Sequence, residues 1–217
     1  LLVGGTGLYF RAFEHGLAQM PNADAEVRAQ LAAELERDGA TVLHQRLARV
    51  DAAAAARIHP NDPQRVSRAL EVYRVTGKSM TQLGASATLR PFPGPVLKLI
   101  IAPANRAVFH QRLAARFDDM LERGLLNEVR ALRARRDLSL DLPALRAVGY
   151  REVWRYLDDE LDHEQMRERA VIATRQLAKR QMTWLRKESC GSWFDSETAA
   201  LDEQLLQAAA TFLRHPK

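Results

Sequence analysis

Two short apolar segments that resemble buried strands lie far apart in this sequence, and together they restrict the folds open to it. Residues 1–5 run from leucine and valine into a glycine pair, like the end of a strand that enters a turn, and residues 96–101 form the second segment. The sequence between them has a helical pattern. Because a buried strand needs neighbours for its hydrogen bonds, we predict an α/β core that a helical insertion interrupts.

Most of the chain is expected to be helical, and the positions of the expected helices divide it into segments. Residues 25–73 are alanine-rich and helical in pattern, and residues 79–95, which contain three prolines, are expected to form a connecting loop. Further helices are expected at about residues 106–124, 127–136, 146–157, 164–187 and 199–213. We therefore expect residues 1–23 to be part of the α/β core, 24–95 the helical insertion, and 96–217 the mainly helical remainder of the core.

Composition excludes several classes of protein. Apolar runs are too short to cross a bilayer, and no signal peptide is recognisable. A single cysteine, Cys190, excludes a disulfide framework or a multi-cysteine zinc site, and the six histidines lack metal-ligand spacing, so no metal-binding residues are predicted. The net charge of +5 favours a polyanionic partner, and a cytoplasmic location is expected.

The segment from His59 to Tyr73 predicts a capped helix with a polar face. Asn61 or Asp62 can cap it, with Pro63 in the first turn. A buried stripe is expected from Val66, Ala69, Leu70 and Tyr73. Gln64, Arg65 and Arg68 gather on the other side, where they can bind phosphate or a base edge. A solvated face whose arginines pair with nearby acids is the alternative.

The helix expected at residues 164–187 is strongly two-sided. One arc carries five positive charges, and the opposite arc is apolar. The first arc contains Arg175, Lys179, Arg180, Thr183, Arg186 and Lys187; the second contains Val171, Thr174, Leu177, Ala178, Met182 and Leu185, with Trp184 at the border. Such dense positive charge indicates a phosphate backbone nearby, and Trp184 can stack on a base or belong to the core. Gln181, inside the apolar arc, either ties down a neighbouring segment or faces a ligand.

Two glycine-containing segments offer close backbone approach to a ligand. Arg146 and Arg151 flank Val148-Gly149-Tyr150, and Gly4-Gly5-Thr6 lies at the expected strand-to-helix turn, where its N–H groups and hydroxyl can meet a phosphate. For the first segment, the alternative is a glycine near a helix start with Tyr150 packed inside. For the second, it is a simple turn, which is what most glycine pairs form.

These motifs, in this order and spacing, resemble the bacterial-type tRNA dimethylallyltransferases (tRNA isopentenyltransferases). The similarity runs through nearly the whole chain. It is carried by Gly4–Tyr9, Asn61–Val72, Ile101–Pro103, Val148–Arg151 and, most specifically, Thr174–Arg186.

The resemblance implies an activity, a fold and partners. Enzymes of this family transfer a dimethylallyl group from dimethylallyl diphosphate to N6 of the adenosine 3′-adjacent to the anticodon, with Mg2+ as cofactor. The implied fold is a P-loop-like core with a helical insertion that grips the anticodon loop, and a monomer is the default for an enzyme that clamps one tRNA. By motif position, the implied tRNA-binding residues are Thr6, Arg28, Gln64, Arg65, Ser67, Arg68, Arg146, Val148, Gly149, Tyr150, Arg151, Lys179, Arg180, Gln181, Thr183, Trp184 and Arg186; Gly5 and Thr6 are implied to bind diphosphate.

The sequence departs from the family at its start. The family's phosphate loop and the aspartate that acts as its general base are not among these 217 residues, so we expect the chain alone to be inactive, with its catalytic base outside it. Two alternatives remain: a noncatalytic helical nucleic-acid-binding protein, and a prenyltransferase that acts on free adenine nucleotides.

Overall fold

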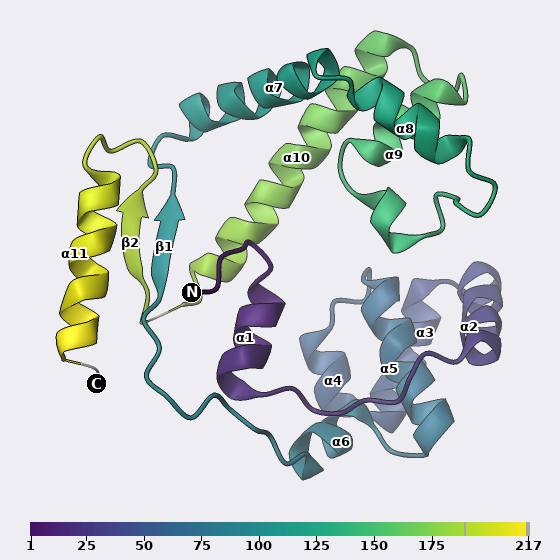
Figure 1. Ribbon diagram of the computed structural model, residues 1–217. Coiled ribbons are helices and arrows are strands. Elements are labelled where there is room, and N and C mark those ends of the chain that lie inside the picture. Colours follow the sequence, from purple (N-terminus) through teal and green to yellow (C-terminus); the bar gives the residue numbers. More distant parts are fainter. Residues whose placement is uncertain (189, 216–217) are drawn as a thin grey trace. The chain divides into compact units, whose positions relative to one another are not determined.

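The computed structural model describes residues 1–188 and 190–215, and the chain divides into two compact units. Unit 1 comprises Leu1–Gly7 and Gly94–Lys217, and unit 2 comprises Leu8–Pro93. Residues 8–23 thus belong with the helical segment, whereas the sequence analysis grouped them with residues 1–7. The described chain is mostly helical with one small parallel sheet (Figure 1).

Unit 2 is a cluster of short helices, several of which begin at a side-chain cap. After α1 (Gly7–His15), which begins at the unit boundary, come α2 (Ala25–Asp38), α3 (Ala40–Val50), α4 (Ala52–Arg57), α5 (Pro63–Thr76) and α6 (Met80–Ser86). Asp24, Asp51 and Asp62 accept hydrogen bonds from the first turns of α2, α4 and α5. The core of the unit consists of Leu31, Leu43, Leu47, Ala55, Val66, Ala69 and Leu70.

Two expectations for unit 2 were wrong. Residues 79–95 are not all loop, because Ser79 and Gln82 form a capping box that starts α6. Tyr73 was expected in the buried stripe of α5 but is 36% exposed, while Val72 beside it is fully buried. A helical periodicity gives the direction of a side chain, but not whether a neighbour covers it.

Unit 1 combines a helical cluster with the sheet. Its helices are α7 (Arg106–Glu122), α8 (Leu125–Arg133), η1 (Pro143–Arg146), α9 (Tyr150–Leu157), α10 (His163–Leu185) and α11 (Leu201–Arg214). The helical core includes Phe117, Val129, Val153, Met166 and Ala170. None of the described helices is long and apolar enough to cross a membrane.

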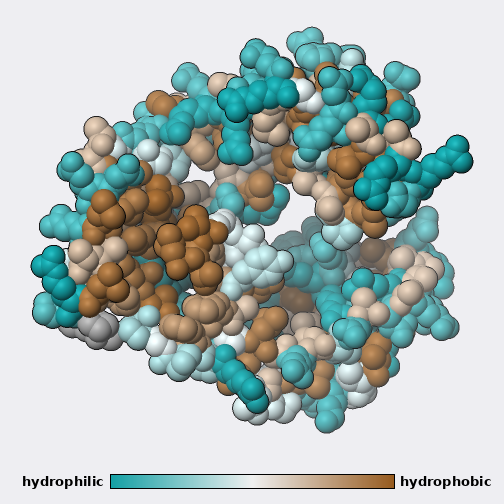
Figure 2. Space-filling view, viewed as in Figure 1, coloured by the Kyte–Doolittle hydropathy of each residue, from teal (hydrophilic) through white to brown (hydrophobic). Residues whose placement is uncertain are grey.

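The sheet pairs β1 (Leu99–Ala102) with β2 (Ser192–Asp195) in parallel, with Ile100 opposite Trp193. β2 was missed by the sequence analysis, because a four-residue strand has too few alternations to show a period. Gly191 lets β2 begin close to β1, since a Cβ there would lie 2.4 Å from Cδ1 of Ile100. Figure 2 shows apolar surface gathered over the sheet and α11, where Ile101, Trp193 and Leu206 are exposed.

The strand expected at residues 1–5 is not formed in the structure. Leu1 and Val3 are exposed, and no strand of the described chain lies beside them. A strand is defined by its hydrogen-bonded neighbour, so an apolar segment without one stays irregular, whatever its composition.

Candidate nucleic-acid interface

The basic arc predicted from the periodicity is exposed, although α10 ends at Leu185, so that Arg186 and Lys187 follow its last turn. Arg175, Lys179, Arg180, Arg186 and Lys187 are all exposed, and none of them forms a salt bridge with a carboxylate in the part of the chain that the structure describes. Most other arginines of unit 1 do pair with acids, for example Arg133 with Asp158 at 2.6 Å. A row of like charges without carboxylate partners attracts an anionic partner.

The opposite arc of α10 packs into unit 1, but not along its whole length. Val171 and Ala178 are buried, whereas Leu177 remains 39% exposed. Thr183, in the basic arc, donates its hydroxyl to the carbonyl oxygen of Lys179 at 2.9 Å. Its oxygen keeps a lone pair for a ligand donor.

Residues 5–7 lie against the last turns of α10. The Gln181 side chain donates from Nε2 to the carbonyl oxygen of Gly5 at 3.2 Å, which supports the structural interpretation of this glutamine. A Cβ on Gly7 would lie 2.8 Å from Cε3 of Trp184, so the chain passes directly over the indole. The structure therefore brings the predicted residues Gly5 and Thr6 together with Gln181 and Trp184.

Gln181 also lines a hollow of about 380 Å3 between α7 and α10, at the end of β1. Its other polar lining includes Arg112 and Arg116, one turn apart on α7, and its apolar lining includes Phe109 and Met182. In the sequence, Arg112, Arg116 and Arg123 form a second basic stripe, but acidic neighbours on the same helix favoured a solvated face over a binding site.

The Arg146–Arg151 segment is held by two carboxylates. Glu152, 3% exposed, accepts from the backbone N–H of Gly149 at 2.9 Å and from Nε and Nη2 of Arg151. The Tyr150 hydroxyl donates to Glu128, and this hydrogen bond, with burial, raises the pKa of Tyr150. Gly149 has a φ of 95°, a conformation that side chains rarely adopt.

Arg146, at the end of η1, is exposed and donates from Nε to the carbonyl oxygen of Leu140 at 3.1 Å. Its guanidinium also lies 3.8 Å from the exposed carboxylate of Asp141. Val148, between Arg146 and Gly149, is half-buried. Arg146 and Arg151 thus both keep part of the guanidinium in solvent.

The predicted residues of unit 2 gather around the start of α5. Gln64 and Arg65 are exposed, and Ser67 is half-buried. Nε of Arg65 lies 3.4 Å from the carboxylate of Asp62, which agrees with the alternative of a solvated face whose arginines pair with nearby acids. Arg28 and Arg68 instead both donate to Glu71, which is buried beneath them.

Burial raises the pKa of Glu71, but hydrogen bonds from Arg68, from the backbone N–H of Asp24 and from Arg28 outweigh this effect and leave the pKa below its usual range. The carboxyl group is therefore ionised near neutral pH. Its charge is what holds the two arginines at this place.

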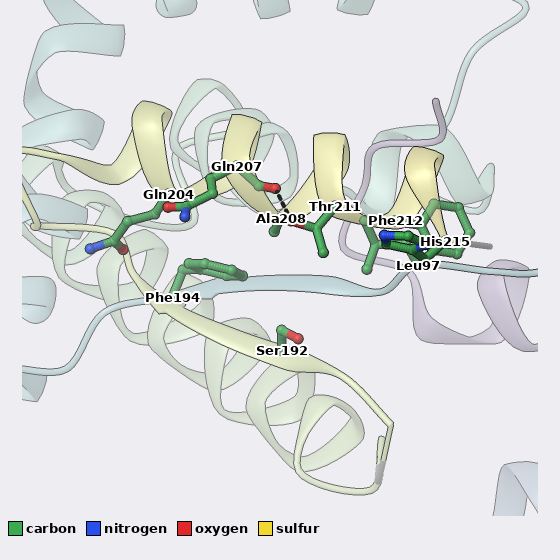
Figure 3. A pocket seen from close by; sticks show the side chains of 9 residues that line it. All are labelled: Leu97, Ser192, Phe194, Gln204, Gln207, Ala208, Thr211, Phe212 and His215. Atoms are coloured by element: carbon green, nitrogen blue, oxygen red, sulfur yellow. Dashed lines mark hydrogen bonds between the residues drawn. The ribbon is translucent and has the colours of Figure 1, made fainter. Parts of the chain in front are cut away.

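A second, larger hollow of about 640 Å3 lies between the sheet and α11 (Figure 3). Phe194 and Ser192 of β2 face Ala208, Thr211 and Phe212 of α11 across it. None of the predicted tRNA-binding residues lines this hollow. It belongs to the apolar surface of the sheet rather than to the basic face.

The described residues contain no group of three or more histidine, cysteine, aspartate or glutamate side chains placed to hold a metal ion. Unit 1 thus offers cations, amides and an aromatic ring, a set suited to phosphate and base recognition. This chemistry is typical of a nucleic-acid-binding α/β protein.

Comparison with known proteins identifies the family of the chain. The IPP transferase family matches residues 1–188, so the chain belongs to this family. It is 54% identical to a tRNA dimethylallyltransferase of Stenotrophomonas maltophilia (strain R551-3) over 98% of this chain and 68% of that protein, and 53% identical to one from strain K279a. The family predicted from the motifs is confirmed.

Solved structures of the same kind also match. The full-length tRNA isopentenylpyrophosphate transferase of Bacillus halodurans is 31% identical with a TM-score of 0.59, over 96% of this chain and 64% of that one. A eukaryotic dimethylallyltransferase acting on tRNA is 26% identical with a TM-score of 0.69, over 97% and 56%. The chain thus spans between about half and two thirds of the length of these relatives.

Proposed function

We propose that the protein containing this chain transfers a dimethylallyl group from dimethylallyl diphosphate to N6 of the adenosine 3′-adjacent to the anticodon of tRNA. The observation that carries the proposal is the exposed row of cations on α10 beside Gln181, Trp184 and the Gly5–Thr6 turn. Cations for the backbone, an aromatic ring for a base and amides for its edge are the elements of tRNA loop recognition.

In this proposal, the two units divide the recognition of tRNA. In unit 2, Arg28, Gln64, Arg65, Ser67 and Arg68 contact the anticodon arm. In unit 1 the contacts come from Thr6, Arg146, Val148, Gly149, Tyr150, Arg151, Lys179, Arg180, Gln181, Thr183, Trp184 and Arg186, and Gly5 and Thr6 contact the diphosphate. The domain assignment of residues 24–95 as the insertion that contacts the anticodon loop is part of the same proposal.

The reaction is a substitution at an allylic carbon. N6 of the target adenine, taken out of the loop stack, forms a bond to the allylic carbon as the bond from that carbon to diphosphate breaks. The proton of the amine passes to the family's aspartate, which lies outside these residues. Within this chain, the residues bind and orient the loop and hold negative charge near the Gly5–Thr6 turn.

The fold we propose is a P-loop-like core with a larger sheet than the two strands described. Parallel sheets are normally buried on both faces, and the exposed apolar surface of β1, β2 and α11 supports further covering elements. Mg2+ as the cofactor comes from the family resemblance and is part of the same proposal. A monomer in the cytoplasm is the simplest setting for this reaction.

Prenyl transfer to an anticodon stem-loop tests the proposal, with dimethylallyl diphosphate and Mg2+ present and nucleosides read by mass spectrometry. We expect the 217-residue chain alone to bind the stem-loop without turnover, and a version extended to the full length of the relatives to modify only the adenosine 3′ of the anticodon. Free adenine nucleotides serve as the control acceptor, and their modification would favour the second alternative. An extended protein that binds RNA but modifies nothing would leave the noncatalytic binding protein as the better description.

A further inference from the structure

Glu71 is a buried charge that pairs with two arginines, Arg68 one turn away on α5 and Arg28 on α2. Its side chain, on α5, is almost completely buried, with 1% of the residue exposed. Oε1 accepts from the backbone N–H of Asp24 and from Nε of Arg28, each at 2.9 Å, and Oε2 accepts from Nη1 of Arg68 at 2.8 Å. A buried carboxylate stays charged only when it is paired and hydrogen-bonded, and these three donors meet that need.

The two arginines use Glu71 differently. Arg68 donates from Nη1 to Glu71 and from Nη2 to the carbonyl oxygen of Pro21 at 2.7 Å, so both ends of its guanidinium fork are occupied. It ties the segment before α2 to α5. Its side chain is 30% exposed.

Arg28 commits only one edge of its guanidinium. Its Nε bonds to Glu71, its Nη1 and Nη2 groups donate to no acceptor within residues 1–188 and 190–215, and its side chain is 56% exposed. The free Nη1–Nη2 edge presents two parallel donors that can bind a phosphate bidentately. Glu71 thus holds the Nε side of Arg28, while the Nη1–Nη2 edge has no partner among the described residues.

We propose that Glu71 is a positioning residue that holds Arg28 in the orientation in which it binds a phosphate of the anticodon arm. This inference rests on the proposed function. Fixing the guanidinium before binding removes the cost of ordering a long side chain at that moment. Of the two arginines, Arg68 also ties the segment before α2 to α5, whereas Arg28 keeps one guanidinium edge available for the phosphate.

A double-mutant cycle tests this role. The Kd of the 217-residue chain for a fluorescein-labelled anticodon stem-loop is measured by anisotropy at several KCl concentrations, for wild type, Arg28→Ala, Glu71→Gln and the double variant. We expect Arg28→Ala to weaken binding about tenfold, as for one charge-assisted contact, and to reduce the slope of log Kd against log [KCl] by about one. Glu71→Gln should weaken binding similarly and add little to Arg28→Ala.

Two further variants test whether the orientation of the Arg28 guanidinium matters beyond its charge, and whether loss of a paired carboxylate in unit 2 weakens binding by itself. Arg28→Lys keeps the charge but lacks the fork, so it should not restore wild-type affinity. Glu34→Gln is the matched control, because Glu34 also accepts from two arginines of unit 2, Arg46 and Arg74, and should leave the Kd unchanged. Circular dichroism melting reports folding for each variant.

Several outcomes would overturn the inference. One is a folded Glu71→Gln variant that binds with the wild-type Kd. Another is that Glu71→Gln weakens binding as much in the Arg28→Ala background as in the wild type. The third is full affinity in Arg28→Lys, a result that tests the inference even if Glu71→Gln does not fold. If the wild-type chain does not bind the stem-loop, the proposed function fails with it; if the wild type binds and the Glu71 cycle is additive, this inference fails alone.

Discussion

Two glycines allow the closest packing within the candidate interface. A Cβ on Gly5 would lie 2.1 Å from Nε2 of Gln181, and one on Gly7 would lie 2.8 Å from Cε3 of Trp184. The glutamine side chain is flexible and can move aside, but the indole is a rigid ring. At the residue scale, the absence of a side chain at position 7 therefore determines how residues 5–7 meet α10.

We predict that Gly7→Ala destabilises the protein by about 1–3 kcal/mol, because the added methyl group overpacks the contact with Trp184. Unfolding in urea measures the loss, and a shift in tryptophan emission that disappears in a Trp184→Phe background identifies its origin. Gly84→Ala is the control: apart from its chain neighbours and its own helix backbone, nothing lies within 4 Å of the added Cβ, so the stability should stay the same or rise by up to about 1 kcal/mol. Equal stability of the two variants would contradict the prediction.

One buried carboxylate joins the starts of two helices. Asp51, 6% exposed, caps α4 by accepting from the backbone N–H of Ala54 at 3.0 Å. It also accepts from the hydroxyl of Thr81 at 2.7 Å and from its backbone N–H at 3.0 Å, in the first turn of α6. At the scale of the element, α4 and α6 are short helices whose positions depend on a shared cap.

We predict that Asp51→Ala costs about 1–3 kcal/mol of unfolding free energy, because three donors lose a buried acceptor. Thr81→Val removes only the hydroxyl donor and should cost less. Urea titrations followed by circular dichroism compare the two. A loss in Thr81→Val as large as that in Asp51→Ala would show that the carboxylate is not the connecting group.

Paired carboxylates in both units determine how the whole molecule responds to acid. The pKa of Asp38 falls to about 2 because of its hydrogen bond with Arg37, and hydrogen bonding to Arg74 lowers the pKa of Glu34. In unit 1, Arg167 lowers the pKa of Asp118. A pKa lowered in the folded state gives a stabilisation that is complete above the unfolded value, near 4, and is lost as the pH falls through the folded value.

We predict that the midpoint of thermal unfolding falls steeply below about pH 4. Between about pH 7 and 5 the decline should be shallow, since desolvation and nearby arginines lower the pKa of His110 and make its protonation unfavourable in the fold. Circular dichroism melts from pH 7 to 2 measure the curve, and Asp38→Asn should flatten it between about pH 4 and 2. A midpoint that rises on acidification would contradict the assignment of these pairs.

Local signals in the sequence predicted the main helices of unit 1, the cap of α5 and the basic arc at the end of α10, because a cap or a helical period depends on residues within a few positions. They did not divide residues 25–73 into separate helices, and they missed α6. The motifs also determined the family. The strand at residues 1–5 was wrong, and β2 was missed, because a strand exists only through a partner that the local sequence does not contain.

Only the tertiary structure decided which predicted residues meet. Arg28 meets Glu71 across 43 positions, and Gln181 meets Gly5 across 176, separations at which no periodicity connects them. The sequence gives an arginine its charge, whereas its surroundings decide which of its donors are already used. That is why the motif alone did not separate Arg68, with both ends of its fork occupied, from Arg28, which keeps one edge in solvent.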